Sequence, residues 1–560
     1  MSPFRKVFSP LNPPDKLGHG IFPKLLFSSN LSDSSGPGGN KGNCSNKHFP
    51  EWTLTKGKSR MMKIWFTVLL FMVFRATLSG EDPIIITLEP HKFYCVPDTD
   101  HVLTFKAYYT PISHDELHYS IHDLYGNEIL KDTAITENDI DITTTINLPR
   151  GYYRIYFPAL NTYFGLTVLP FRVREPDRFF AVHASLTKND ELTLLDFSDG
   201  FLRQESLVKT LKNTGIGLVR ERIRPAVFAP SPGEFVYDGN SHRYEEARML
   251  YDQYDIDVMG FFAITNWWMR RPNDRVNPTE RHNRYPVNMH AITDVWDSIA
   301  KRWDGVLKNI EIWNEPRSGT QDRLAPLYHS IAYSFKDQEY PKILGSGYTA
   351  GTMEKYVPDM GNMRALDVID KISFHQYTDP EITSPMVRTM RTNLDKFGII
   401  DMPVINSESG AQYVGGIWPE YEQNVTGGGI SAGRAVENRA FGQRHFFEFV
   451  YSPVIRNDYD KQNSQICVSG TALLDFASYL HAVLLLSHRE YIGDLDISSQ
   501  ALMQNRVFAG ADTAVVTLYR NYEENISLPV QPLILYGQDG RVLDLEIGRA
   551  SCRERVCVGV

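Results

Sequence analysis

The sequence is poor in cysteine and carries no excess of positive charge, and both features exclude classes of protein. Only 5 of the 560 residues are cysteine, and no Cys/His spacing is typical of a zinc site. The formal net charge is −9 and no Lys/Arg-dense stripe occurs, which argues against a nucleic-acid-binding protein. No glycine-rich phosphate or dinucleotide loop follows the first predicted strand. We therefore expect no metal, no cofactor and no nucleic acid among the partners.

The few cysteines leave at most one disulfide bridge in the part of the chain expected to be mature protein. Cys44 lies in residues 1–61, which we expect to be a leader, and Cys552 and Cys557 lie in residues 547–560, which we expect to be a non-native tail. Cys95 and Cys467 remain. They could form one bridge, or both could be free buried thiols.

What the chain does contain is the composition of a globular protein. Hydrophobic residues make up 42%, charged residues 22% and aromatic residues 12%. The length suits one large domain with one or two small ones. The aromatic content fits either sugar-binding platforms or aromatic-rich β cores.

Both ends of the chain differ from the rest. Residues 1–61 lack periodicity and are rich in Ser, Pro, Gly, Asn and Lys, as expected of a disordered or untranslated leader. Residues 62–80 have a basic start, an apolar run from Ile64 to Phe74 and small residues at the end, which predicts a signal peptide and a secreted or secretory-pathway protein. If uncleaved, the same segment would be a signal anchor and the one stable membrane span. Residues 547–560 are expected to be a non-native tail.

Three folded regions are predicted between these ends. Residues 81–174 show short alternating strands separated by turns, typical of a β-sandwich. Residues 175–490 alternate strands with helical patterns. Residues 491–546 return to β patterning and form a small, truncated C-terminal β domain. Asn424 and Asn525 are glycosylation acceptors of the kind found in secreted chains.

The central region predicts a (β/α)₈ TIM barrel. We expect its helices at 201–213, 244–254, 294–305 and 471–486, and its strands at 179–182, 216–223, 257–263, 306–313, 342–346, 369–374, 403–406 and 445–451. Eight such units favour a closed barrel over an open doubly wound sheet. The predicted fold class is therefore α/β, with a (β/α)₈ barrel flanked by an N-terminal β-sandwich and a C-terminal β module.

Two carboxylates lie at the ends of predicted barrel strands. Glu315, in Asn314-Glu315-Pro316, follows the fourth strand, and Glu408 follows the seventh. A barrel brings both to one rim, because the loops that follow the strands build the same face. Hydrolysis of a glycosidic bond needs such a pair, one protonated to donate to the leaving oxygen and one ionised to attack the anomeric carbon.

Longer runs around these residues resemble a known group of enzymes. The runs are 215–222, 230–235, 311–316 and 372–377. Residues 175–490 thereby resemble the clan A (β/α)₈ retaining glycoside hydrolases, closest in motif style to the β-xylosidase/α-L-iduronidase-like and endoglucanase-like families. The resemblance implies that Glu315 is the general acid/base and Glu408 the nucleophile of a double displacement. It also implies that Asn314 bonds the sugar 2-hydroxyl.

The resemblance assigns supporting roles to three further residues. Arg220 would lie under the nucleophile and favour its ionised form, Tyr377 would point its hydroxyl at Glu408, and His375 would line the sugar site. Other interpretations remain open. Arg220 could be a core ion-pair residue, with Arg222 or Arg224 in the catalytic place, and His375 and Tyr377 could be hydrogen-bonded core groups.

Aromatic residues in the predicted rim loops are candidates for sugar binding. Trp268, beside Trp267, follows the third strand, and Trp418 follows the seventh. Their rings could stack on pyranose faces or could be lids over the core. Glu311 is interpreted as a structural charge of the barrel interior.

These observations lead to one hypothesis and two rivals. The hypothesis is a secreted retaining glycosidase acting on an oligo- or polysaccharide. The rivals are a catalytically inactive barrel that binds glycans or serves adhesion, and a lyase, for which no Tyr/Lys base arrangement is evident. The sugar, the linkage, the anomeric configuration, endo or exo action and the oligomeric state do not follow from the sequence.

Overall fold

The structure is a computed structural model. It describes residues 85–88, 92–108, 116–137, 141–171, 175–187, 204–239, 242–262, 267–269, 288–316, 321–336, 338–339, 341–349, 352–410, 421–449, 451, 465, 471–495, 504–511, 513–519, 534–543 and 556–559. All of them belong to one compact unit, Ala76–Val560. The predicted leader, the signal peptide and Cys467 lie outside the described residues, and Cys95 is a free buried thiol.

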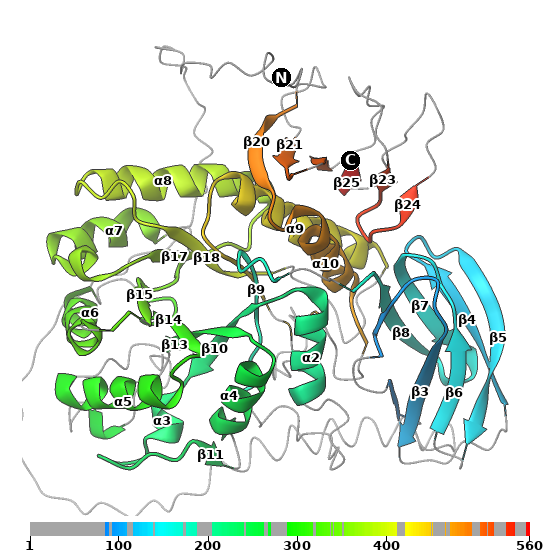
Figure 1. Ribbon diagram of the computed structural model, residues 1–560, viewed down its shortest axis with the longest axis horizontal. Helices are drawn as coiled ribbons and strands as arrows, with labels where there is room; N and C mark the ends of the chain where they lie inside the picture. The colour runs from blue at the N-terminus through cyan, green and yellow to red at the C-terminus, as the bar shows by residue number, and fades with distance from the viewer. Residues whose placement is uncertain are drawn as a thin grey trace, which may run out of the picture. The chain divides into compact units, whose positions relative to one another are not determined.

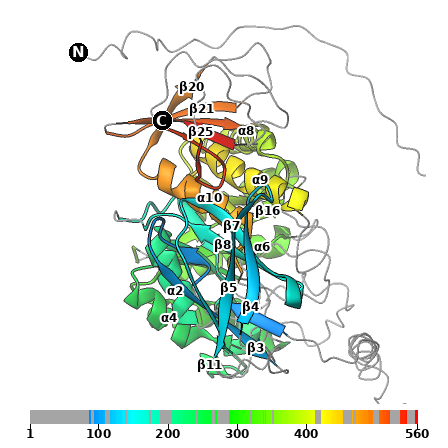
Figure 2. The same cartoon turned by 90° about the vertical axis from the view of Figure 1, so that its right-hand side faces the viewer.

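The N-terminal region is a single curled β-sheet. Its strands, several of which Figure 2 shows side by side, are β1 (Ile85–Leu88), β2 (Tyr94–Cys95), β3 (His101–Tyr108), β4 (Glu116–Asp123), β5 (Glu128–Glu137), β6 (Asp141–Ile146), β7 (Gly151–Phe157) and β8 (Thr162–Val168). Their order is β1-β3-β6-β5-β4-β7-β8-β2. The rings of Phe105 in β3 and Phe164 in β8 are only 4.8 Å apart, although four strands separate them in that order. The sheet therefore folds over itself and buries an aromatic core, as in a β-sandwich.

The central region is a closed parallel barrel (Figure 1). Its strands are β9 (Phe180–His183), β10 (Leu218–Ile223), β13 (Asp257–Phe262), β14 (Leu307–Glu311), β15 (Lys342–Leu344), β16 (Tyr348–Thr349), β17 (Ile372–His375), β18 (Val404–Ser409) and β19 (Phe446–Glu448). β9 pairs with both β10 and β19, which closes one side. β15 pairs with β14, and β16 pairs with β17. The two short strands β15 and β16 therefore together occupy the position of the fifth barrel strand. The prediction of a (β/α)₈ barrel is confirmed.

Helices surround the barrel strands in Figure 1. They are α2 (Gln204–Thr214), α3 (Pro225–Phe228), α4 (Tyr244–Gln253), α5 (Met289–Arg302), α6 (Gln321–Phe335), α7 (Met353–Asn362), α8 (Thr383–Asp395), α9 (Tyr421–Ala440) and α10 (Leu474–Leu486). Short 3₁₀ turns are η2 (Pro158–Leu160), η4 (Trp267–Met269), η6 (Ala365–Val368) and η7 (Pro380–Ile382), and a small hairpin joins β11 (Asp238–Gly239) to β12 (His242–Arg243). The helix predicted from residue 294 begins earlier, because the Asn288 side chain caps it by accepting a bond from the Ala291 amide at 3.1 Å.

The C-terminal region is a six-stranded sheet of order β20-β21-β22-β25-β23-β24. Its strands are β20 (Glu490–Asp494), β21 (Gln504–Ala509), β22 (Ala514–Tyr519), β23 (Leu535–Tyr536), β24 (Val542–Leu543) and β25 (Val556–Gly559). β25 falls within the segment expected to be a tail. The domain boundaries and the non-native origin of that segment stay predictions.

The barrel interior begins with an apolar layer. Alternate residues of a strand face the inside, so successive layers draw on every second position. Six strands contribute one buried residue each to this layer, namely Ala181, Leu218, Met259, Leu344, Ile405 and Phe447. The next inward positions toward the strand ends are mostly polar, as the next subsection describes.

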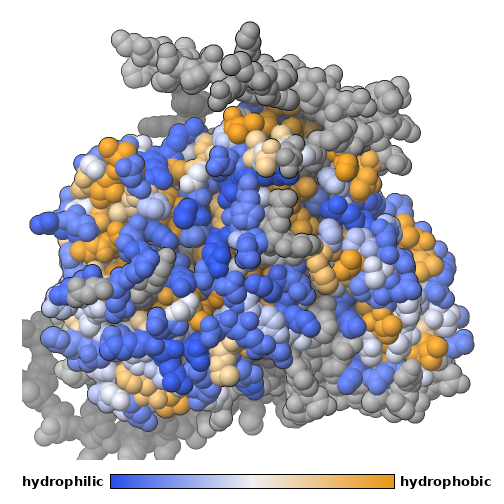
Figure 3. All heavy atoms as spheres, in the orientation of Figure 1, coloured by the Kyte–Doolittle hydropathy of each residue, from blue (hydrophilic) through white to orange (hydrophobic). Residues whose placement is uncertain are grey.

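Hydrophilic residues dominate the visible surface. The face in Figure 3 is largely hydrophilic, with hydrophobic side chains in small separate groups. None of the described helices combines the length and the apolar character that a membrane span requires.

Candidate active site

The residues above the apolar layer form a polar layer centred on Arg220. Two of its members, His183 and Arg220, lie two residues after Ala181 and Leu218 of the apolar layer. The third, Glu311, lies at an inward position of β14, and all three are buried. The Arg220 and Glu311 side chains are 0% exposed, and the Nη2 atom of Arg220 lies 2.5 Å from the Oε2 atom of Glu311. Buried charges are normally paired, so this layer is a built polar network.

A kink at the end of the fourth strand presents Glu315. Trp313 and Glu315 adopt left-handed backbone conformations, with φ of 81° and 46°. Such values are uncommon for residues other than glycine and occur at functional sites, where the surroundings hold the strained backbone in place. Here Asn314 forms a parallel bridge with Gly347, and the Glu315 amide donates to the Gly347 carbonyl at 3.2 Å. The kink turns the Asn314–Glu315 pair toward the barrel axis.

A register shift in the seventh strand presents Glu408. Phe374 of β17 pairs with Asn406 of β18, but the next residue, His375, pairs with Glu408. One residue of β18, Ser407, is therefore extra at this point, which is the definition of a bulge. Because of it, both Ser407 and Glu408 reach the interior, and the Ser407 hydroxyl donates to Glu311 at 2.5 Å.

Arg220 binds Glu408 directly. The Nη1 atom of Arg220 donates to the Oε2 atom of Glu408 at 2.6 Å, and the Glu408 side chain is only 11% exposed. Burial opposes ionisation of this carboxyl, but the surrounding His375, Arg220, His183 and Tyr377 side chains outweigh it and hold the pKa of Glu408 well below its usual value. The two carboxylates beside Arg220 likewise raise its pKa, against the opposing effect of burial. Glu408 is therefore ionised at neutral pH.

Tyr377 gives Glu408 a second hydrogen bond. Its hydroxyl donates to the Oε1 atom of Glu408, on the side away from Arg220. Burial and the negative charge of Glu408 hold the pKa of Tyr377 well above its usual value, so the hydroxyl keeps its proton. Both oxygens of Glu408 are therefore held by donors, which fixes the plane of the carboxylate.

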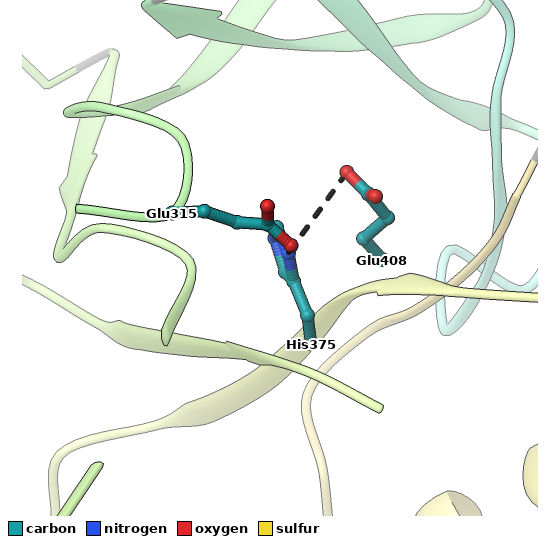
Figure 4. A group of neighbouring side chains, drawn as sticks. All are labelled: Glu315, His375 and Glu408. Atoms are coloured by element: carbon teal, nitrogen blue, oxygen red, sulfur yellow. Dashed lines mark hydrogen bonds and ion pairs between the residues drawn. The ribbon is translucent and has the colours of Figure 1, made fainter. Parts of the chain in front are cut away.

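His375 connects the two carboxylates (Figure 4). Its Nδ1 atom lies 3.0 Å from Oε1 of Glu315 and 4.0 Å from Oε2 of Glu408. Its Nε2 atom lies 3.5 Å from Nη2 of Arg220. Arginine can only donate, so Nε2 is the acceptor and Nδ1 carries the proton that Glu315 accepts. The His375 side chain is 0% exposed and lies beside both carboxylates, and its role in lining the sugar site stays a prediction.

Asn314 has a fixed amide orientation for the same reason. Its Oδ1 atom accepts from Nη2 of Arg220 at 2.6 Å. The oxygen must face the arginine, because arginine has no acceptor. The NH₂ group is thus the part of Asn314 that remains for another acceptor, such as a substrate hydroxyl.

Within the described residues, Glu315, His375 and Glu408 have the spacing of metal ligands, with one potential ligand atom of each lying within 4.8 Å of the others. The hydrogen-bond pattern does not favour a metal there. The Nδ1 atom that faces both carboxylates carries a proton, and a histidine nitrogen must be deprotonated to bind a metal. Glu408 is in addition already neutralised by Arg220. The arrangement is suited to proton transfer and to attack by a carboxylate.

The structure brings Glu315, Glu408, Asn314, Arg220 and Tyr377 together, but it places Trp268 elsewhere. The Trp268 indole donates to the Ala229 carbonyl at 3.1 Å and lines a hollow of about 640 Å³ beside α5. None of the grouped residues lines that hollow. Trp418 lies outside the described residues. Of the alternative arginines, Arg222 lies over the Phe261 ring at 5.2 Å, and Arg220 is the one that contacts Glu408.

Four residues of the network were not predicted as part of the site. Glu311 was interpreted as a structural charge, yet it contacts Arg220 directly. His183 lies 3.1 Å from Arg220, and Ser373 and Ser407 donate to Glu311. One sequence signal could have identified them, because each is a polar residue within a predicted buried strand (Glu311 and Ser373) or directly after one (His183 and Ser407).

Comparisons with known proteins agree with this fold. The structure resembles that of a family 39 glycoside hydrolase from the gut symbiont Bacteroides cellulosilyticus WH2, with a TM-score of 0.64 and 12% identity over 85% of this chain and 100% of that chain. A GH10 xylanase from Thermobacillus composti has a TM-score of 0.38 and 11% identity over 55% of this chain and 97% of its own. An endo-β-1,4-glucanase from Xanthomonas axonopodis pv. citri has a TM-score of 0.37 and 12% identity over 50% of this chain and 90% of its own.

The last two scores are too low to carry an argument. The first shows that this chain shares the fold of that enzyme, and it assigns no family. No protein-family profile matches the chain, and no curated protein sequence matches it. The closeness to β-xylosidase/α-L-iduronidase-like or endoglucanase-like families stays a prediction.

Gly347 is required by the position of His375. A Cβ atom at Gly347 would lie 2.1 Å from the Nε2 atom of His375, whereas one at Gly345 would lie 3.2 Å from the end of the flexible Ile369 side chain. We expect Gly347→Ala to push the ring out of place and to lower the free energy of unfolding by about 1–3 kcal/mol. Urea unfolding of Gly347→Ala beside Gly345→Ala, the matched control, measures this.

A double variant identifies the cause of that loss. If the ring causes the clash, Gly347→Ala combined with His375→Ala unfolds at the same urea concentration as His375→Ala alone. Equal stability of Gly347→Ala and Gly345→Ala would contradict the close packing.

Proposed function

We propose that the protein is a retaining glycoside hydrolase, with Glu408 as nucleophile and Glu315 as general acid/base. The observation that carries the proposal is the separation of the two carboxylates. Their facing oxygens lie at most 4.8 Å apart. Retaining enzymes place the two carboxyl groups about 5–5.5 Å apart, and inverting enzymes place them about 6.5–9.5 Å apart to admit a water molecule.

The roles follow from what each carboxylate contacts. Glu408 is bonded to Arg220 and Tyr377, and so it is the carboxylate kept ionised for attack on the anomeric carbon. Glu315 meets the neutral ring of His375 and is 42% exposed, so a leaving group and later a water molecule can reach it. His375 occupies one oxygen of Glu315, which leaves the other free to carry the proton.

The reaction proceeds in two steps. Glu408 attacks the anomeric carbon while Glu315 donates a proton to the leaving glycosidic oxygen, and a covalent glycosyl–Glu408 ester forms. Glu315 then removes a proton from water, the water attacks the same carbon, and Glu408 leaves as a carboxylate. The amide NH₂ of Asn314 would bond a sugar hydroxyl in both steps. Every proton moves between Glu315 and the substrate or water.

The substrate is proposed to be an oligo- or polysaccharide outside the cell or in the secretory pathway. This rests on the signal peptide predicted at residues 62–80, which lie outside the described residues.

Removal of either carboxylate should abolish hydrolysis of ordinary substrates. With a panel of 4-nitrophenyl α- and β-glycosides and polysaccharides, we expect Glu315→Gln to lower kcat/KM by about 10²–10⁴-fold. On a 2,4-dinitrophenyl glycoside, Glu315→Gln should recover much of its kcat/KM, because this leaving group departs without a proton in the first step. Glu408→Gln should stay inactive on both. Glu354→Gln, an exposed glutamate on α7, is the control.

Activity that survives both substitutions would overturn the assignment. An inactive wild type that still binds a polysaccharide would instead favour the rival of a glycan-binding barrel.

The stereochemistry of the product tests retention separately. We expect the first sugar released to have the anomeric configuration of the substrate, because two displacements restore it. Proton NMR of the reaction, recorded before mutarotation, measures the ratio of anomers. An inverted first product would show that Glu408 acts as a base on water.

Tyr377 should set the acid limb of the pH profile. Loss of its hydrogen bond removes one of the interactions that lower the pKa of Glu408, so in Tyr377→Phe the folded-state pKa rises. Attack requires the ionised form of Glu408. As the pH falls, Tyr377→Phe therefore loses activity at a higher pH than the wild type does. We expect the acid limb of kcat/KM to move to higher pH, and kcat/KM at neutral pH to fall about 10-fold or more.

The matched control is Tyr451→Phe, which removes a buried hydroxyl that bonds the Leu207 carbonyl at 2.9 Å. An unchanged acid limb in Tyr377→Phe would show that Tyr377 does not act on the nucleophile.

A further inference from the structure

We infer that Glu311 is a positioning residue that divides the charge of Arg220 and thereby keeps Glu408 reactive as a nucleophile. The inference rests on the proposed function and assigns a role to a residue that does not itself reach the substrate. Two observations carry it. The single positive charge of Arg220 contacts two carboxylates, those of Glu311 and Glu408, and the Glu311 side chain is completely buried.

Glu311 is saturated with donors. Its Oε2 atom accepts from Nε and Nη2 of Arg220 at 2.9 and 2.5 Å. Its Oε1 atom accepts from the hydroxyls of Ser373 and Ser407 at 2.6 and 2.5 Å. Four donors on one buried carboxylate fix its position.

Glu311 in turn fixes the plane of the guanidinium. The Phe261 ring lies 3.8 Å from Cζ of Arg220 and covers one face. With Nε and Nη2 held by Glu311, the only orientation left aims Nη1 at Glu408 at 2.6 Å. The second Nη2 proton then points at Asn314 at 2.6 Å and is shared more weakly with Nε2 of His375 at 3.5 Å. The planar, rigid fork of arginine makes this transmission possible, and a lysine could not provide it.

Charge division follows from the same geometry. One cation lies between two buried carboxylates, and each carboxylate reduces the attraction that the other receives. If Glu311 were neutral, the whole positive charge of Arg220 would act on Glu408. Glu408 would then be a weaker nucleophile in the first step and a better leaving group in the second.

Glutamine at position 311 removes the charge and can preserve the contacts. Its carbonyl can accept from Arg220, and its NH₂ can donate to Ser373 and Ser407. Ser373 can release its own proton to the Gly345 carbonyl, which already lies 2.6 Å away. Glu311→Gln is therefore close to a charge-only change.

Glu221 provides the matched control. It is the next residue on β10 after Arg220, and it is also 0% exposed. Its donors are the Leu186 amide at 2.8 Å, the Thr187 amide and hydroxyl at 3.4 and 2.9 Å, and the Tyr251 hydroxyl. All of them lie outside the network around Arg220. Glu221→Gln therefore changes a buried carboxyl group of the same strand without touching the site.

The kinetic test separates the two chemical steps. On an aryl glycoside whose kcat is limited by hydrolysis of the intermediate, we expect Glu311→Gln to lower kcat/KM about 10-fold or more while kcat stays the same or rises. A general loss of structure lowers both together. Glu221→Gln should leave both unchanged per folded molecule, whatever its effect on stability.

A stability test requires no activity. In Glu311→Gln or Glu408→Gln, Arg220 keeps one carboxylate, but in the double variant it keeps none and remains a buried unpaired charge. We expect the shift in the urea midpoint of the double variant to exceed the sum of the two single shifts. Glu221→Gln combined with Glu408→Gln should be additive.

Additive shifts for the Glu311/Glu408 pair, or an equal fall of kcat and kcat/KM in Glu311→Gln, would overturn the inference. A wild-type protein inactive on the whole panel would count against the proposed function instead, and the urea midpoints would still decide whether Glu311 and Glu408 share Arg220.

Discussion

The rest of the site depends on a buried guanidinium that must be neutralised. Arg220 is inaccessible to water and bonds Glu311, Glu408 and Asn314 at once. Breaking a buried ion pair by removal of one partner costs about 3–5 kcal/mol, so the protein cannot leave any of these groups unmatched. Under the proposed function, the carboxylate that pairs with Arg220 at the rim is also the nucleophile, so the same contacts would serve stability and reactivity.

Backbone irregularities at two strand ends make this arrangement possible. A regular fourth strand would alternate its side chains in and out, and a regular seventh strand would direct either Ser407 or Glu408 inward, but not both. The left-handed residues Trp313 and Glu315 and the bulge at Ser407 depart from that alternation. Their strain is held by the neighbouring strand, where Gly347 leaves room for the His375 ring. The two carboxylates meet because the backbone is irregular at both places.

The flanking β modules are tied to the barrel and to each other by buried polar contacts. The carboxylate of Asp539 accepts from the Tyr152 amide at 2.9 Å, and Arg541 pairs with Asp123 at 2.9 Å. The Tyr152 hydroxyl also donates to the Ala472 carbonyl just before α10, at 3.1 Å. Because α10 packs against the barrel through Tyr479, whose hydroxyl bonds the Ala181 carbonyl at 2.8 Å, the three regions support one another. The described parts of the two modules therefore contact each other and the barrel directly.

The sequence by itself determined the barrel and the two carboxylates, because apolar runs alternating with helical patterns recur along the chain and a motif at a strand end can be read locally. It predicted that Glu315, Glu408, Asn314, Arg220 and Tyr377 are candidates for one site. It did not predict that Glu311 contacts Arg220 or that Trp268 lies beside α5, and it left open whether His375 is a buried hydrogen-bonded group. Only the tertiary structure decided these points, because ring closure and strand register bring distant residues into one interior layer, and neither is encoded in any short segment.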